Sequence, residues 1–270
     1  MLKSTPILAL FLAFAPITAL SHEFWIDAPR YQVETGEKIE ASLRNGQNFN
    51  GLDLSYFERR IVFFDRIDRN GRAPVEARAG DAPAFAGEVD LEGLFTLVYQ
   101  STNDTLIYRE WAKFQKFIDH KAFGDVRSQH DARGLPEAEF KEVYSRYAKA
   151  LFAVGTGAGQ DAPRGLEIEI VALKNPYTDD LSSGLPVQVI YRDLPRANAQ
   201  VEVFEKAPGG EVLVTTVQTN SEGIAIVPVK AGHEYLLDNV VLREPSAALA
   251  DKTGAVWETL WAALTFRLPG

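Results

Sequence analysis

Cysteine is absent from the 270 residues, and methionine occurs only once, as Met1. The chain therefore has no disulfide and no thiol chemistry, and burial of its core must hold the fold. Basic residues are outnumbered, with 28 lysines and arginines against 37 aspartates and glutamates and a formal net charge of −9. Because phosphate binding relies on a basic surface, we do not expect a nucleic-acid partner.

Familiar catalytic motifs are also missing. The chain has no G-x-S-x-G elbow, no H-E-x-x-H motif and no P-loop. Carboxylates are plentiful, but their spacing alone does not single out an acid/base pair. The sequence therefore favours a non-enzymatic role.

The first residues predict a secretory leader. Lys3 supplies a positive charge, residues 6–17 form an apolar run, and Ala19 and Ser21 are small residues at the positions that signal peptidase reads. The run is shorter than the roughly 20 apolar residues of a membrane span. We expect residues 1–21 to be removed, so that the mature chain begins at His22, is periplasmic and has no membrane span. An uncleaved membrane anchor is the alternative.

Short strands are expected along most of the mature chain. Lys38–Arg44 alternates apolar with polar residues, the period of a half-buried strand. Pro208-Gly209-Gly210 lies between two apolar segments and predicts a hairpin. Further strands are expected at residues 60–65, 93–100, 166–170, 201–204, 212–214, 224–229, 235–242 and 257–268.

Two segments carry a helical period instead. Apolar residues recur at three- and four-residue steps over residues 111–118, which predicts an amphipathic helix. Residues 136–152 predict a second helix, because Pro136 suits a first turn, acidic residues follow it, and the apolar residues share one face. The polar residues 128–134 between them are expected to form a loop.

These patterns predict a mainly β protein with two β-sandwich domains of immunoglobulin-like or transthyretin-like kind and a helical insertion in or after the first. We place an N-terminal β-rich domain with two helices at residues 22–180 and a small C-terminal sandwich at residues 181–270. Asn175-Pro176 and Ser182-Ser183-Gly184 mark the turn or linker between them.

Histidine is scarce, and the first of the four histidines is the most informative. Cleavage after Ser21 would give His22 a free α-amine beside its imidazole, and these two nitrogens can chelate one metal ion. An amine with a pKa of about 8 is available near neutral pH. Nitrogen ligands suit Cu, Ni or Co. Phe24-Trp25-Ile26 predicts that the terminus lies near the protein body, although chain ends often fray into solvent.

His120 and His130 are the candidates for a further ligand. His120 is expected at the end of the first helix, where a surface cap is the competing interpretation. His130 lies in the polar segment, where a solvated loop residue is the competing interpretation. The neighbouring Asp119 and Asp131 could add an oxygen ligand or orient an imidazole.

The mature start His22-Glu23-Phe24-Trp25-Ile26 resembles the H-[DE]-F-W-[IL] opening of a group of exported bacterial proteins. Residues 144–151, 166–168, 175–176, 219–223 and 257–266 match that group in order. The family is a domain of unknown function, often labelled a periplasmic component of cobalt or nickel uptake. The resemblance implies a metal-related periplasmic role that His22 carries. Where members often have a further histidine, this chain reads Asp238-Asn239-Val240-Val241, which leaves His120 and His130 as candidates.

Three functions follow as hypotheses. The first is a periplasmic protein that binds a transition metal through His22 and takes part in metal uptake or handling with a membrane transporter component. The second is an extracytoplasmic module that binds a protein or glycan, with no metal role. The third is a copper oxidase of the N-terminal-histidine type, similar to lytic polysaccharide monooxygenases.

Overall fold

The computed structural model describes residues 22–270, and its main feature is a ten-stranded sheet. Eight strands follow the order β15-β14-β17-β18-β10-β8-β5-β6, and β2 and β9 pair with the two ends of β10. The ten strands are β2 (Gln32–Val33), β5 (Ile61–Asp68), β6 (Gly71–Pro74), β8 (Gly93–Ser101), β9 (Asp104–Tyr108), β10 (Phe140–Val154), β14 (Gln200–Lys206), β15 (Val212–Gln218), β17 (Glu234–Arg243) and β18 (Ala255–Arg267).

Two smaller sheets and three helices complete the described residues. The first small sheet contains β1 (Glu23–Asp27), β3 (Lys38–Gln47), β4 (Asn50–Leu54) and β7 (Phe85–Glu88). The second contains β11 (Ile168–Ala172), β12 (Leu185–Tyr191), β13 (Leu194–Pro195) and β16 (Ile224–Val227). The helices are α1 (Trp111–His120), α2 (Val126–Ala132) and α3 (Ala247–Thr253), and one 3₁₀ turn spans Glu58–Arg60.

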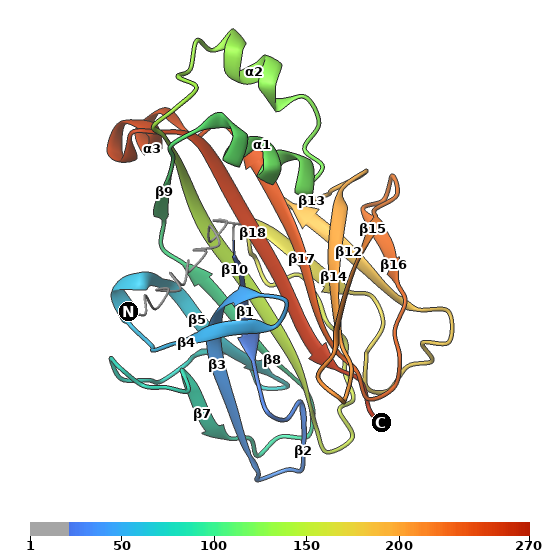
Figure 1. Ribbon diagram of the computed structural model, residues 1–270. Coiled ribbons are helices and arrows are strands. Elements are labelled where there is room, and N and C mark those ends of the chain that lie inside the picture. The colour runs from blue at the N-terminus through green and yellow to red at the C-terminus, as the bar shows by residue number, and fades with distance from the viewer. Residues whose placement is uncertain (1–21) are drawn as a thin grey trace, which may run out of the picture.

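The small sheets pack on opposite faces of the large sheet. Phe152 of β10 belongs to the core under β1 and β3, whereas Leu151 belongs to the core under β11 and β12, since successive side chains of a strand alternate between faces. Helices α1 and α2 share the face of the first small sheet: Trp261 of β18 packs under α1, and Ala263 packs under β1. Figure 1 shows the two helices at the upper end of the long strands, with β1, β3 and β4 lower in the view.

The long parallel strands β10 and β18 form the centre of the large sheet. They pair from Lys141 to Ala150 of β10, and nearly every residue of both strands is buried. The helix predicted at residues 136–152 is therefore wrong. Strands covered on both faces are apolar almost throughout, without the alternation that marks a half-covered strand. Both faces of β10 carry apolar residues, so some of these residues are also three or four positions apart and imitate the period of a helix.

The other predicted elements agree better with the structure. The mainly β class, the strands and the hairpin at Pro208-Gly209-Gly210 are confirmed, as is the helix over residues 111–118. The predicted loop at residues 128–134 is wrong over residues 128–132, which belong to α2. The two-domain division stays a prediction, and the large sheet runs across it through the β10–β18 pair. The predicted leader lies outside the described residues. Within residues 22–270, no helix is long and apolar enough to cross a membrane.

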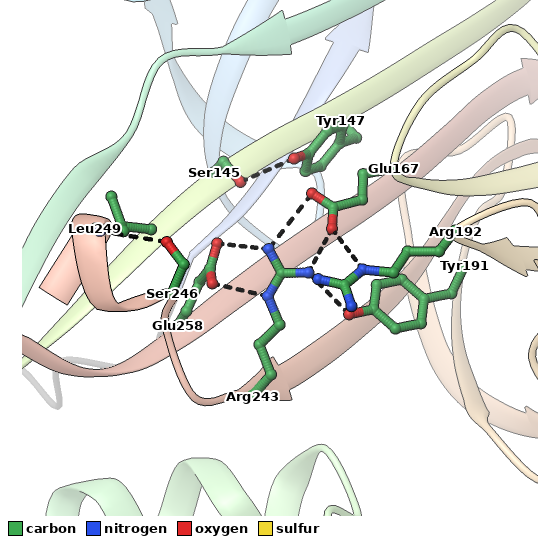
Figure 2. Close-up of polar contacts among 9 residues, drawn as sticks. All are labelled: Ser145, Tyr147, Glu167, Tyr191, Arg192, Arg243, Ser246, Leu249 and Glu258. Carbon is green, nitrogen blue, oxygen red and sulfur yellow. Dashed lines mark hydrogen bonds and ion pairs between the residues drawn. The ribbon is translucent and has the colours of Figure 1, made fainter.

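Two groups of charged side chains fasten the second small sheet to the large sheet. Lys149 of β10 contacts Asp161 at 2.8 Å and Glu169 of β11 at 2.9 Å, and all three side chains are fully buried. Arg243 of β17 donates to both oxygens of Glu258 at 2.7 and 2.8 Å and also binds the Glu167 carboxylate, as Figure 2 shows. Each group joins segments far apart in the sequence.

Candidate functional site

A row of four side chains crosses the large sheet where the helices meet the first small sheet. Strand register places Ala148 of β10 beside Ala263 of β18, Ala263 beside Asp238 of β17, and Asp238 beside Glu202 of β14. The alanines leave room for β1, which packs over β10 and β18. The two carboxylates are almost wholly buried, at 2% and 3% exposed. The row therefore places two acids in the interior beside the start of the mature chain.

The end of α1 brings cationic partners to this row. Lys121 directs its ammonium at Glu202 Oε2, 2.5 Å away, and at Asp238 Oδ2, 2.7 Å away. His120 Nε2 lies 2.9 Å from Glu202 Oε1, and its side chain remains 49% exposed. The Lys121 ammonium also lies 4.9 Å from the centre of the Trp261 ring. The contacts link the helix end to strands β14 and β17.

The charges of these groups depend on each other. Burial opposes ionisation of Glu202, but hydrogen bonds from His120 and Lys121 hold its pKa below the usual value. The hydrogen bond to Glu202 raises the pKa of His120. Burial alone would lower the pKa of Lys121, but attraction by Asp238 and Glu202 outweighs it and the pKa is raised. Burial raises the pKa of Asp238. Glu202 and Lys121 therefore form the ionic centre of this group.

Glu23, the first residue of β1, faces the same group. It is 4% exposed, and its Oε2 atom has no hydrogen-bond partner within residues 22–270. Burial, followed by the negative charge of Asp238, raises the pKa of Glu23 to about 7. A buried carboxylate oxygen without a partner is unfavourable, because no interaction replaces its lost hydration.

Arg146 of β10 lies in the adjoining row. Its guanidinium stands 4.3 Å from the centre of the Trp261 ring and 5.0 Å from that of Tyr144. The side chain is buried, which lowers its pKa, and Nη1 finds no partner among the described residues. We call Glu23, His120, Lys121, Arg146, Glu202 and Asp238 the junction cluster.

The junction cluster differs from the buried group formed by Lys149, Asp161 and Glu169. The oxygens of Asp161 and Glu169 are matched by Lys149 and by backbone N–H groups of residues 162, 164 and 172. The carboxylate oxygens of this group are therefore paired, and the group has a structural role. In the junction cluster Glu23 and Arg146 retain unmatched polar atoms, and one histidine reaches solvent. Unmatched buried groups of this kind are candidates for ligand binding.

Two of the five residues that we predicted as metal ligands are related to the junction cluster. His120 belongs to it through its contact with Glu202, and His22 is exposed and directly precedes Glu23 in the chain. Asp119 is exposed and accepts a hydrogen bond from Gln115 at 2.8 Å.

The other two predicted residues lie in α2. Asp131 is exposed and pairs with Arg127 at 2.8 Å. His130 is completely buried among aromatic rings, with Trp257 Nε1 3.0 Å from its Nδ1 and the carbonyl oxygen of Pro136 3.0 Å from its Nε2. The competing interpretation of His130 as a solvated loop residue is wrong, and both ring nitrogens contact other groups in this arrangement.

Sequence reasoning missed the buried charges at the junction. Glu202 interrupts the apolar run of β14, and Asp238 interrupts that of β17. A charged residue inside an apolar run is the signal that could have identified them. The pattern of apolar and polar residues does not give the order of the strands, so it does not show which charged residues come into contact. Within residues 22–270, no group of three or more His, Asp or Glu side chains is arranged to hold a metal ion.

Family comparison places the chain among known sequences. The model of a family described as a domain of unknown function (DUF4198) matches residues 19–242. The chain belongs to this family. In this DUF4198 protein, the matched range includes His22 and every residue of the junction cluster. The family description states no activity, and the cobalt or nickel label is not part of it. No curated protein matches the chain.

Solved structures similar to this DUF4198 protein are distant. A tetra-tandem repeat from the extending region of a large adhesion protein is 10% identical, with a TM-score of 0.23, and the match covers 92% of this chain and 49% of that one. This chain therefore spans about half the length of that structure. The D0-D1 domain of intimin is 13% identical, with a TM-score of 0.20 and coverage of 91% and 97%. Salmonella alpha-2-macroglobulin reacted with methylamine is 13% identical, with a TM-score of 0.21 and coverage of 93% and 15%.

Proposed function

We propose that this protein is a periplasmic metal-binding protein. It captures Ni(II), Co(II) or Cu(II) with the α-amine and imidazole of His22 after the leader has been removed. It then buffers the ion or passes it to a membrane transporter.

The observation that carries this proposal is that the same buried carboxylates organise His120 and the start of the mature chain. His120 contacts Glu202. Burial, and then the charges of Asp238, Lys121 and Glu202, shift the pKa of Glu23, the residue that follows His22. The two histidines, 98 positions apart by their numbers (120 − 22), thus adjoin one cluster. His22 would supply two nitrogens and His120 a third.

The contact of His120 with Glu202 suits a ligand role. Metal-binding histidines commonly donate the second ring N–H to a carboxylate, which fixes the ring and makes the other nitrogen more basic. Because Nε2 contacts Glu202, Nδ1 is the nitrogen available to a metal ion. The half-exposed position of the ring suits exchange of an ion with a partner better than a closed cage does.

Calorimetric titration of the mature protein with Cu(II), Ni(II) and Co(II) tests the proposal. The N-terminus should first be confirmed by mass spectrometry. We expect one site per chain, lost both in His22→Ala and in a chain with a methionine before His22. His120→Asn should weaken binding by about 10-fold or more. His233→Asn is the matched control, because His233 pairs with Glu205 away from the cluster. Equal binding by the mature and blocked chains would refute the proposal.

One observation favours an interaction module as a second candidate. Strand β15 is an edge of the large sheet, carries no charged residue, and exposes Leu213 and Val214 by 53% and 39%. Such an edge can pair with a strand of another chain. Val214→Lys should then abolish concentration-dependent association in sedimentation experiments and leave metal titrations unchanged. A protein that stays monomeric at high concentration would remove the support for self-pairing at this edge.

A further inference from the structure

Glu23 carries one of the buried polar atoms that the described part of the chain leaves unmatched. Its side chain is more than nine-tenths buried, and Oε2 contacts no hydrogen-bond donor within the described part of the chain. The backbone N–H of Glu23 acts on its carboxylate, so the carboxylate lies close to the main chain that continues to His22. The unmatched oxygen is therefore held beside the residue that becomes the mature terminus.

The neighbouring cations do not satisfy this oxygen. Lys121 contacts Glu202 and Asp238 at 2.5 and 2.7 Å. The Arg146 guanidinium is stacked against Trp261 at 4.3 Å and makes no hydrogen bond with Glu23. Three buried acids thus lie among the Lys121 ammonium, the His120 imidazole and the Arg146 guanidinium, and none of these cations makes a hydrogen bond with Glu23 Oε2. This oxygen therefore keeps a free position for a ligand.

We propose that Glu23 is an oxygen ligand of the metal ion held by His22. This inference rests on the proposed function. It gives the site a mixed set of donors from two successive residues: the amine and imidazole of His22 and the Glu23 carboxylate. Nitrogen and oxygen donors without sulfur suit divalent ions such as Ni(II), Co(II) and Cu(II), whereas Cu(I) prefers thiolate and thioether ligands. The mature sequence contains neither cysteine nor methionine, so the site discriminates against Cu(I).

The test compares Glu23→Gln with the parent mature chain, using Ni(II), Co(II) and Cu(II) salts alone as probes. We expect affinity to fall by at least 10-fold and the visible absorption of the Cu(II) complex to shift, because an anionic oxygen donor is replaced by a neutral amide. Without metal, the variant should unfold at the same temperature as the parent or higher, since a buried unmatched carboxylate is gone. Glu34→Gln is the matched control, because Glu34 is an exposed glutamate in the segment between β2 and β3.

The outcomes separate the two proposals. Unchanged affinity and an unchanged Cu(II) spectrum in Glu23→Gln, with binding still lost in His22→Ala, would overturn Glu23 as a ligand and leave the metal site intact. If both His22→Ala and Glu23→Gln bind metal as tightly as the parent chain, the proposed function and the ligand role of Glu23 are both refuted. If Glu23→Gln does not fold, Glu23→Asp gives an equivalent test, because it retains the charge and withdraws the oxygen by one methylene. Unchanged affinity in that variant would also refute the inference.

Discussion

Replacement of Lys121 by methionine tests whether the junction cluster holds the helices against the large sheet. The side chains of Lys121, Glu202 and Asp238 are 4%, 4% and 2% exposed. Methionine fills a similar volume but leaves Asp238 without a contacting cation and Glu202 with His120 alone, and removal of one partner from a buried pair destabilises by about 3–5 kcal/mol. At roughly 2–4 °C per kcal/mol for a chain of this size, the unfolding temperature should fall by about 6–20 °C.

Thermal and urea unfolding of the metal-free protein near pH 7.5 measure this loss. Lys38→Met is the matched control, because Lys38 pairs with Glu40 at 2.8 Å where both side chains are about half exposed. An exposed pair contributes at most about 1 kcal/mol. Adding Glu202→Gln and Asp238→Asn to Lys121→Met should restore much of the stability, since the uncompensated charges are then removed. A Lys121→Met variant no less stable than Lys38→Met would refute the ionic account of the cluster.

Three further predictions concern stability. The raised pKa of Glu23, about 7 against a usual value of 4.5, means that the folded state keeps a proton that the unfolded chain releases. Stability should therefore fall between pH 4.5 and 7 by about 3 kcal/mol, and Glu23→Gln should remove this fall in urea titrations of a chain with a methionine before His22. His130→Phe should lower stability by about 1–3 kcal/mol through the unpaired Trp257 N–H, with unchanged metal titrations. A weaker calorimetric signal in that variant would contradict our placement of His130. Ala263→Leu should cost about 1–3 kcal/mol in chemical unfolding by crowding β1, and an unchanged midpoint would contradict the packing described.

Much of the β architecture could be predicted from local patterns. Strand β3 has one face on a core and alternates buried with partly exposed residues, so its period is legible in the sequence. The hairpin between β14 and β15 is equally local, because Pro208-Gly209-Gly210 marks the turn. Strand β10 was misread because burial on both faces erases alternation. Residues 128–132 were misread as loop because α2 is short and two residues, Val126 and His130, carry its buried face.

The candidate site was predictable only in part. His22 and His120 could be selected because histidine is scarce and each has a definable place, one at the mature start and one at a helix end. Asp238, Glu202 and Lys121 come from segments far apart in the chain, and only the order β14-β17-β18-β10 brings them together. Local periodicity does not contain that order, so their meeting could not be predicted.

The position of β18 bears on how this protein can be shortened. The family match ends at residue 242, yet β18 follows it and lies between β10 and β17. A chain stopped at residue 242 would therefore lose an interior strand of its largest sheet. Strand β10 would be separated from Asp238 and Glu202, since Ala263 of β18 lies between Ala148 and Asp238. Gene fragments designed from the family boundary should then be insoluble, whereas those extended to residue 267 retain the whole sheet. During synthesis, β18 must likewise be translated before β10 and β17 can take their places on either side of it.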